Sequence, residues 1–553
     1  AGSLMDFNGY RGTILPDWNN PLAGRSGFVG TSHGYISTRL NLAALAGQTI
    51  TFRWRMGLDD SGYAWGWWVD NVRAYTCIPN FTISGNAGAS GVTLSYTDGT
   101  AKTITSQPNG TYSLPVTPGW SGTVTPTHPC YTFDPVNRTY TSVTANQTSQ
   151  DYTTTFNPAS GCANVNLFIG EDLKGIFGVP QLGVEFSSFP GMLAGPVKVI
   201  STNGEPVFTT QVVTSGGSYN ELAGFPVNQF TTEYWFPYYD HGYPNIPGNN
   251  MRTWILVGNP SDTLTAEVEI RIGGTLRGSY SIPPGANVTP RWIGLIGGPV
   301  QVRSTNAVDI FASQRVFTVP FNSFNEVMGY PASQFTTEYW FPWYDTTYMN
   351  TILLVGNTSS SQSAVVDMFI GTSKMGTYTI GANSTLKQFY PSKVDGPVRV
   401  VSTNGVNIVT SQFTLSGTEN SFNEVMGYPF DQFDTEYWFP FYDHGYPNIS
   451  GISLRTWILI GHPSTTQTAN VEVYVDGVLK GTYAIAPGAN VQPRWIGLQG
   501  GPVRIVSDIP IFASQRVFTV PTNAFNEFMG IPLSQFSTQY WFTWYDSVYM
   551  NNT

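Results

Sequence analysis

The chain has 553 residues and a formal net charge of −10, yet charged residues make up only 11% of it while aromatic residues make up 14%. No cluster of basic residues indicates binding to nucleic acid or to an anionic membrane surface, and no apolar run approaches the roughly 20 residues of a membrane-spanning helix. The 58 glycines and 38 prolines are typical of short β-strands joined by turns.

The first two segments of the chain are each predicted to form a small β domain. Residues 1–77 contain strand-like runs and close with the aromatic segment 66–73 (Gly-Trp-Trp-Val-Asp-Asn-Val-Arg). Residues 78–160 contain short runs rich in Val, Thr and aromatic residues, separated by turn residues at intervals of about 8–12 residues, which is typical of a β-sandwich.

The remaining chain repeats one phrase. It reads Phe-x-Thr-(Glu/Gln)-Tyr-Trp-Phe-x-aromatic-Tyr-Asp and occupies residues 230–240, 335–345, 433–443 and 536–546. A fixed period of about 100 residues indicates an extended array of similar modules rather than one catalytic domain, and the flanking sequences alternate between two types. We assign complete modules to residues 225–324, 325–422 and 423–525. Each is expected to form an immunoglobulin-like β-sandwich, because its short runs alternate apolar with polar residues.

Two incomplete modules flank the three complete ones. Residues 161–224 match the back half of a module, and residues 526–553 match the front half of the same type. A sandwich that lacks strands exposes unpaired backbone groups, which a strand from another subunit can fill. We therefore predict a head-to-tail homopolymer in which residues 526–553 of one subunit complete residues 163–219 of the next. The side chains expected on this donor strand are Tyr540, Trp541, Phe542, Trp544 and Tyr545.

Three stretches resemble known families. Residues 34–76, with the segment 66–73, resemble the end of a jelly-roll ancillary domain that follows the catalytic domain of secreted bacterial peptidases, which implies a partial domain here. Residues 79–156, with Tyr131-Thr-Phe-Asp-Pro135, resemble Ig-like or carboxypeptidase-regulatory-like sandwiches of secreted proteins. The repeats resemble tandem β modules of large surface proteins from filamentous bacteria of the Chloroflexota. These resemblances imply an extracellular, cell-surface location and no catalysis in this segment.

Few residues suggest chemistry. No zinc-peptidase, nucleophile-elbow or phosphate-loop pattern is present, so we expect no catalytic residues and no enzyme activity. Asp240-His241 recurs as Asp443-His444, but the other modules lack the histidine, and an Asp-His pair before Gly-Tyr-Pro is expected to make local turn hydrogen bonds. The one cofactor considered is Ca²⁺, to which loop carboxylates could offer oxygens: Asp59, Asp60 and Asp70.

The three cysteines indicate limited cross-linking outside the cytosol. If the strands of residues 78–160 run alternately up and down, Cys130 and Cys162 fall at one end of the sandwich and Cys77 falls at the other. Because a disulfide needs Cα atoms within about 7 Å, Cys130–Cys162 is the favoured pair.

The aromatic phrase itself has two interpretations. Its rings could pack within a module and against the neighbouring module, since aromatic side chains bury a large area, or they could stack on sugar rings. The first interpretation is favoured, and surface glycans remain the ligand considered under the second.

These observations predict an extracellular, non-enzymatic, all-β protein that is the subunit of a surface filament or of another structural layer. An alternative from a different class is the accessory region of a secreted hydrolase, which would bind carbohydrate or cell wall. A monomeric adhesin is a third reading. Without strand exchange, residues 163–219 would be a degenerate domain. The expected partners are other copies of the chain and, in the alternatives, surface glycans; nucleic acid is not expected.

Overall fold

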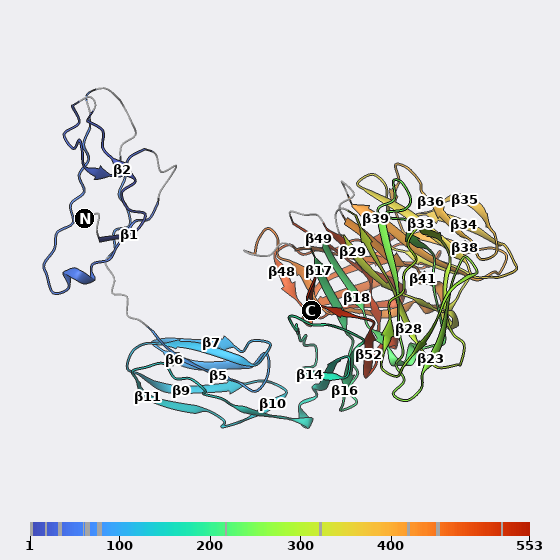
Figure 1. Cartoon of the computed structure of the whole chain (residues 1–553), viewed down its shortest axis with the longest axis horizontal. Helices are drawn as coiled ribbons and strands as arrows, with labels where there is room; N and C mark the ends of the chain where they lie inside the picture. The colour runs from blue at the N-terminus through green and yellow to red at the C-terminus, as the bar shows by residue number, and fades with distance from the viewer. Residues whose placement is uncertain are drawn as a thin grey trace. The chain divides into compact units, whose positions relative to one another are not determined.

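The computed structural model describes residues 4–16, 19–30, 36–58, 60, 67–73, 80–215, 218–319, 323–416, 421–449, 454–520 and 524–553. It divides into two compact units, residues 1–78 and residues 79–553 (Figure 1). The elements of the described residues are β-strands and single turns of 3₁₀ helix, so the predicted all-β fold is confirmed. None of the helical turns in these ranges is long and apolar enough to cross a membrane.

The first unit contains two short strand pairs in its described part. β1 (Met5–Phe7) pairs with β4 (Arg39–Leu40), and β2 (Gly12–Thr13) pairs with β3 (Ser26–Gly27). Leu22 is the one buried apolar side chain among the described residues of this unit. The partial jelly-roll stays a prediction.

Residues 80–160 form a sandwich of short antiparallel strands, as predicted. β5 (Phe81–Asn86) pairs with β8 (Thr111–Val116), and the larger sheet has the order β11-β9-β6-β7. Its core contains Ile83, Leu94 and Val124, all fully buried. The remaining strands are β6 (Thr93–Asp98), β7 (Thr100–Thr105), β9 (Trp120–Thr127), β10 (Tyr131–Asp134), β11 (Arg138–Val143) and β12 (Thr153–Phe156).

In modules 1 and 2 a five-stranded sheet faces a smaller sheet across an apolar core, and module 3 has equivalent strands with the two sheets joined. In module 1 the large sheet has the order β24-β23-β27-β20-β30 and the smaller sheet has the order β25-β22-β28-β29. The alternation of Ala266-Glu-Val-Glu-Ile-Arg-Ile272 on β23 places its apolar residues in the core. The strands are β20 (Glu233–Phe236), β21 (Tyr239–His241), β22 (Met251–Gly258), β23 (Ala266–Ile272), β24 (Thr275–Ile282), β25 (Asn287–Val288), β26 (Leu295–Gly297), β27 (Val300–Ser304), β28 (Phe311–Thr318), β29 (Phe324–Met328) and β30 (Tyr330–Pro331).

Modules 2 and 3 repeat this plan. The large sheet of module 2 has the order β35-β34-β38-β31-β41. In module 3 the long strand β49 pairs with strands of both groups, so that the path β46-β45-β49-β42-β51 and the strands β44, β47 and β50 form one eight-stranded sheet. Module 2 contains β31 (Glu338–Phe341), β32 (Tyr344–Asp345), β33 (Met349–Asn357), β34 (Ala364–Ile370), β35 (Ser373–Ile380), β36 (Thr385–Gln388), β37 (Val394–Asp395), β38 (Val398–Ser402), β39 (Ile408–Ser416), β40 (Ser421–Met426) and β41 (Tyr428–Pro429). Module 3 contains β42 (Asp434–Phe439), β43 (Tyr442–His444), β44 (Leu454–Gly461), β45 (Ala469–Val475), β46 (Val478–Ile485), β47 (Asn490–Val491), β48 (Leu498–Gly500), β49 (Val503–Thr519), β50 (Phe525–Met529) and β51 (Ile531–Pro532).

A fourth module, here called the closing module, is assembled from both incomplete halves of the same chain. Its large sheet has the order β14-β13-β16-β52-β19, and its smaller sheet has the order β18-β17-β54. Figure 1 shows β52 in red beside β16 in green. The strands are β13 (Ala163–Ile169), β14 (Asp172–Val179), β15 (Leu193–Ala194), β16 (Val197–Ser201), β17 (Thr210–Ser215), β18 (Ser218–Ala223), β19 (Phe225–Pro226), β52 (Gln539–Phe542), β53 (Tyr545–Asp546) and β54 (Asn551–Asn552).

Strand pairing moves the module boundaries away from the predicted positions. β30 pairs with β20 of module 1, although the sequence places residues 330–331 in module 2. In the same way, β19 completes the closing module and β51 completes module 3. Each of these short strands is an apolar residue followed by Pro, such as Tyr330–Pro331. The structural boundary between modules therefore lies just after this strand, at a 3₁₀ turn such as Ala332–Gln334. The segment 323–329, in which the sequence suggests a capped helical turn, forms strand β29 because its residues complete the smaller sheet.

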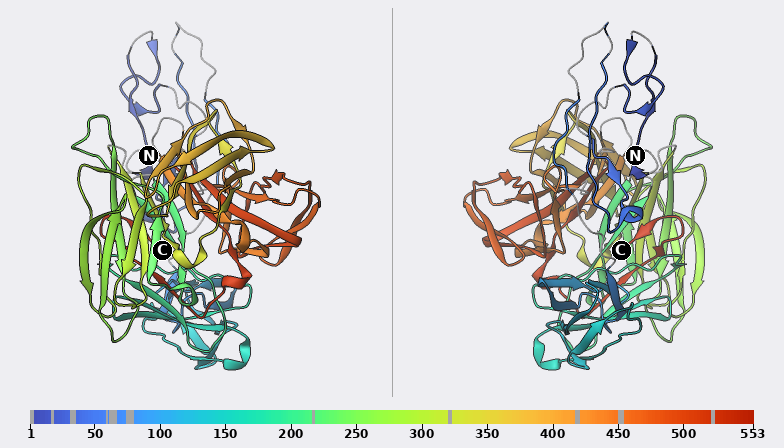
Figure 2. Two further views of the ribbon diagram at one scale, coloured as in Figure 1. Left: turned by 90° about the vertical axis from the view of Figure 1, so that its right-hand side faces the viewer. Right: turned by 90° about the vertical axis from the view of Figure 1, so that its left-hand side faces the viewer.

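The four modules form a closed ring. The strands β18, β29, β40 and β50 contact one another in cyclic order, β18 with β29, β29 with β40, β40 with β50 and β50 with β18. Figure 2 shows the modules following one another around a centre, from green through orange to red. The predicted extended array is therefore wrong for residues 161–553.

Candidate functional site

The ring centre, defined here as β18, β29, β40 and β50, is built from an Asn-Glu pair that occurs once in each module. The side-chain Oδ1 of each Asn accepts a hydrogen bond from the backbone N–H of the Glu in a neighbouring module. The four bonds form a closed cycle: Glu326 to Asn220 at 3.2 Å, Glu424 to Asn325 at 3.1 Å, Glu527 to Asn423 at 2.6 Å and Glu221 to Asn526 at 3.1 Å. All four asparagines are 1% exposed. Because buried polar groups are costly unless paired, this cycle specifies how adjacent modules meet.

A second set of polar contacts supports the same junctions. The hydroxyls of Ser218, Ser323 and Ser421 accept from the backbone N–H groups of Phe324, Phe422 and Phe525 at 2.9, 2.8 and 2.7 Å. At the fourth position the serine is replaced by Ala524, which packs against Tyr219 of the closing module. The junction between module 3 and the closing module is therefore apolar at this point.

An axial cavity of about 210 Å³ runs along the ring centre. Equivalent residues from all four modules line it, including the four glutamates of the Asn-Glu pairs, three of the four asparagines and the glutamines of the 3₁₀ turns. Met328, Met426 and Met529 occupy equivalent positions on its wall, where the closing module has Ala223. No residue of this centre is among the predicted sites, although an Asn-Glu pair recurs in every module at residues 220–221, 325–326, 423–424 and 526–527, and this recurrence was the signal in the sequence.

The four glutamates of the ring centre differ in their partners. Glu326 accepts from Arg315 at 2.6 Å, and Glu527 accepts from Arg516 at 2.6 Å. Glu424 lies opposite Phe413 in the strand ladder and Glu221 lies opposite Val212, at the positions of those arginines. Burial raises the pKa of Glu221 to about 7 and the pKa of Glu424 to about 8, although hydrogen bonds to each carboxyl oppose the shift. Among the described residues, two carboxyls thus have a buried cation as a partner and two do not.

The aromatic phrase joins each module to the next. Tyr234 and Phe236 are fully buried in module 1, but the intervening tryptophan belongs to the core cluster of module 2. The tryptophan in each phrase packs against a phenylalanine of the following module: Trp235 with Phe335, Trp340 with Phe433, Trp438 with Phe536 and Trp541 with Phe230, with ring centroids 5.8 to 6.4 Å apart. These tryptophans are 4% to 8% exposed, so they cannot stack on sugars in the folded ring, and packing is the role that the structure supports.

The predicted donor strand pairs with the predicted groove, but within one chain. Val197 to Ile200 of β16 align with Phe542 to Gln539 of β52, and Leu193 aligns with Asp546. Tyr540, Trp541, Phe542 and Tyr545 are buried, and the carbonyl of Trp544 accepts from Gln211 at 3.0 Å. Exchange of this strand between subunits is therefore not what the structure contains. The same residues complete their own ring because both halves of the closing module lie in one chain.

The other candidate sites lie outside the ring centre. Asp59 is outside the described residues, Asp60 accepts from Asn19 at 3.0 Å, and Asp70 accepts from the backbone of Asn71. The described residues contain no group of three or more potential metal ligands, and the calcium site stays a prediction. His241 accepts from the backbone N–H of Thr253 at 3.1 Å. Asp240 accepts from Asn249 at 2.7 Å, so this pair makes the local turn contacts that its position predicts.

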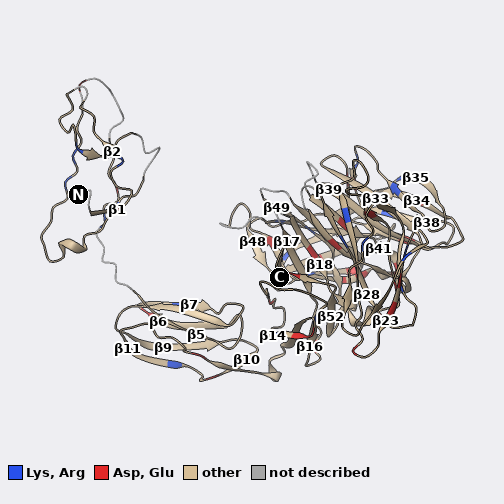
Figure 3. Cartoon of the chain, viewed as in Figure 1, with Lys and Arg blue, Asp and Glu red and all other residues tan. Residues whose placement is uncertain are grey.

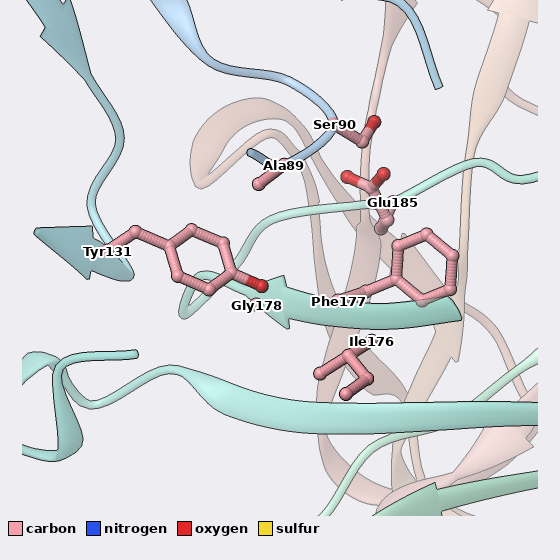
Figure 4. A pocket seen from close by; sticks show the side chains of 7 residues that line it. All are labelled: Ala89, Ser90, Tyr131, Ile176, Phe177, Gly178 and Glu185. Atoms are coloured by element: carbon pink, nitrogen blue, oxygen red, sulfur yellow. The ribbon is translucent and has the colours of Figure 1, made fainter. Parts of the chain in front are cut away.

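A disulfide ties the N-terminal sandwich of the second unit to the closing module. Cys130 and Cys162 are bonded with Cα atoms 5.6 Å apart, the pair that the sequence favours; Cys77 is outside the described residues. Beside it, a Cβ on Gly178 would lie 2.5 Å from the Cβ of Cys130, so glycine permits the close approach. Figure 4 shows Tyr131 above Gly178 and Ser90 beside the carboxyl of Glu185, whose pKa is raised by burial.

No family model matches the chain, and no curated protein matches it. Among solved structures, it is similar to BcpA, the major pilin subunit of Bacillus cereus, and to its D312A variant, both at 8% identity and a TM-score of 0.13. The variant match covers 60% of this chain and 92% of the pilin, and the BcpA match covers 64% and 97%. A structure of the M60 catalytic domain with two CBM51 domains from Clostridium perfringens ZmpB matches at 8% identity and a TM-score of 0.12, covering 83% of this chain and 56% of that one. These scores carry no argument about fold or function.

Proposed function

We propose that this chain is a non-catalytic part of an extracellular surface protein in which residues 161–553 act as a closed, rigid structural ring. The observation that carries the proposal is the pairing of β52, β53 and β54 with β16, β15 and β17, which closes an array that would otherwise be open. A disulfide supports an oxidising compartment. Figure 3 shows that Lys, Arg, Asp and Glu are sparse and scattered over the strands, as expected for a surface hydrated mainly by hydroxyl and amide groups.

A head-to-tail filament would need the closing segment, residues 533–553, to leave its own ring. Within one chain this segment is present at an effective concentration on the order of mM, so it outcompetes the same segment of a second chain for the groove. Once it is docked, the groove is filled. Assembly by exchange of the segment is therefore expected only as a domain swap at high protein concentration, and the closed monomer is the state we propose.

The alternative function is an accessory region of a secreted hydrolase that binds carbohydrate or cell wall. One observation favours it: Tyr348 and Tyr549 are each 76% exposed and occupy equivalent loops of module 2 and the closing module, which are not adjacent in the ring. Exposed rings of this kind can stack on sugars. A glycan array of the full chain, with Tyr348→Ala and Tyr549→Ala combined as the control, tests this alternative.

The ring proposal is tested by comparing the full chain with a chain that ends at Pro532. This end point keeps β51, which belongs to module 3, whereas an end at Met529 would remove it. Light scattering and electron microscopy should show closed monomers for the full chain. The shortened chain should be expanded or aggregated, because the core around Val197 and Val199 loses its cover. Filaments from the full chain and monomers from the shortened chain would contradict the closed ring and support exchange between subunits.

A further inference from the structure

Two of the four buried carboxyls at the ring centre, those of Glu424 and Glu221, accept hydrogen bonds only from neutral side chains among the described residues. Ser411 donates to Oε1 of Glu424 at 2.6 Å, and Gln314 of module 1 donates to Oε2 at 3.3 Å. Thr210 donates to Oε1 of Glu221 at 2.8 Å, and Tyr219 donates to Oε2 at 3.0 Å. Glu424 and Glu221 are 1% and 5% exposed. An ionised carboxylate in such a place is costly unless a positive charge accompanies it.

The charged groups on the packed strands do not supply that positive charge. The described residues of β17 and β39, the ladder partners of the two glutamates, include no Lys, Arg, His, Asp or Glu. The facing groups on β28, β29, β49 and β50 are Arg315, Glu326, Arg516 and Glu527, and these form two ion pairs with one another. Asp443 acts on Tyr219 and adds negative charge near Glu221. The surroundings therefore favour the neutral acid at both positions.

We infer that Glu221 and Glu424 form a pH-sensitive lock of the ring, in which both carboxyls are neutral in the closed state and their ionisation weakens two opposite junctions. Glu424 joins module 2 to module 1 through Gln314, and Glu221 lies where the closing module meets module 3 through Asn526. The other two junctions of the ring contain the arginine-paired glutamates, Glu326 and Glu527, so paired and unpaired carboxyls alternate around the ring.

The direction of the pH effect follows from proton binding. The folded-state pKa values of about 7 and about 8 lie above the ordinary value of 4.5. Between these limits the folded chain keeps protons that the unfolded chain has lost, so stability falls as pH rises. The contribution is complete below the unfolded pKa and is lost once pH exceeds the folded pKa. The closed ring is accordingly expected to be more stable against unfolding at mildly acidic pH than at alkaline pH.

Unfolding in urea at about pH 6 and about pH 9 tests the lock. The unfolding midpoint of the full chain should fall between the two values, and Glu424→Gln should remove a large part of that fall, since the amide keeps the shape without the charge. Glu326→Gln is the matched control: it leaves Arg315 unpaired, so it should lower stability at both pH values while keeping the fall. An equal midpoint at both values, or an undiminished fall in the combined Glu221→Gln and Glu424→Gln variant, would overturn the inference.

If the variants do not fold, infrared spectroscopy of the unmodified chain can still overturn the inference. The unmodified chain at about pH 6 should show the carbonyl band of protonated carboxyl groups, because exposed Asp and Glu are ionised there. The band should disappear as pH rises to about 9. Its absence at the lower pH would show that both glutamates are ionised in the closed ring, and the lock would be rejected.

Discussion

At the residue scale, one substitution in the fourth copy of the aromatic phrase leaves a polar group unpaired. The indole Nε1 of Trp235, Trp340 and Trp438 donates to the glutamate two residues earlier, at 2.7, 2.8 and 2.9 Å. In the closing segment that glutamate is replaced by Gln539, and the Nε1 of Trp541 is buried without a hydrogen-bond partner among the described residues. A buried donor without a partner costs about 1–3 kcal/mol.

We expect Gln539→Glu to stabilise the closed ring by about 1 kcal/mol, since it restores the bond to Trp541. Lys198 occupies the position that Arg399 has beside Glu338 in module 2, so the new carboxylate would also gain a cation. Thermal unfolding of the full chain measures the effect. Lys198→Gln in the same background should remove only the ionic part. If Gln539→Glu instead destabilises the chain, the aromatic phrase at residues 536–546 does not make the tryptophan–glutamate contact of the other three copies.

The local roles of residues were predictable from the sequence, whereas their partners were not. Alternation placed Val268 and Ile270 in a core, and the position of Asp240 before Gly and Pro predicted its turn contacts. The destination of Trp235 in the next module could not be predicted, because a strand's periodicity specifies a face but not the neighbour that covers it. The recurrence of Asn and Glu in each module does not show that the four copies meet at one centre.

At the element scale, the closing segment determines whether the array is open or closed. β54 pairs with β17, and Thr214 lies opposite Asn551 in the ladder. Residues opposite each other in an antiparallel pair have Cα atoms about 4.5–5.5 Å apart, which is within reach of a disulfide.

Cysteines at these two positions should therefore bridge within one chain. In a background with Cys77→Ser, Thr214→Cys combined with Asn551→Cys should run as an oxidised monomer on a non-reducing gel, with faster migration than the reduced form. Each single variant should form no bond beyond Cys130–Cys162 and should migrate more slowly than the oxidised double variant. Covalent ladders of dimers and higher oligomers in the double variant would instead indicate that the closing segment docks on a second chain.

At the scale of the whole molecule, the sequence predicted the all-β, sandwich-like fold but not the closure of the ring. Both halves of the closing module were recognised as complementary, and the structure pairs them. Whether complementary ends meet within one chain depends on the angle between successive modules. That angle results from small contacts such as the cycle of Asn and Glu residues, and the hydrophobic period contains no information about it.

Closure also changes how the molecule should unfold. In an open array each module contacts only its nearest neighbours, so the free energy of unfolding is approximately a sum of the stabilities of the modules and of their interfaces. In this ring every module receives a tryptophan from the one before it, and Trp340 belongs to the core of module 3 although its strand belongs to module 2. Loss of one core therefore removes support from the next in a cycle without ends, and residues 161–553 should unfold in a single cooperative transition.

Trp340→Ala tests this cooperativity. Truncation of a buried tryptophan costs about 3–5 kcal/mol, and in a closed ring the whole transition should shift to lower temperature in calorimetry. Tyr348→Ala in the same module is the matched control, and it should leave the transition in place because that ring is 76% exposed. If Trp340→Ala instead splits the transition, with part of the heat absorbed at the original temperature, the modules unfold independently, because in a cooperative ring no module can remain folded at that temperature without its neighbours.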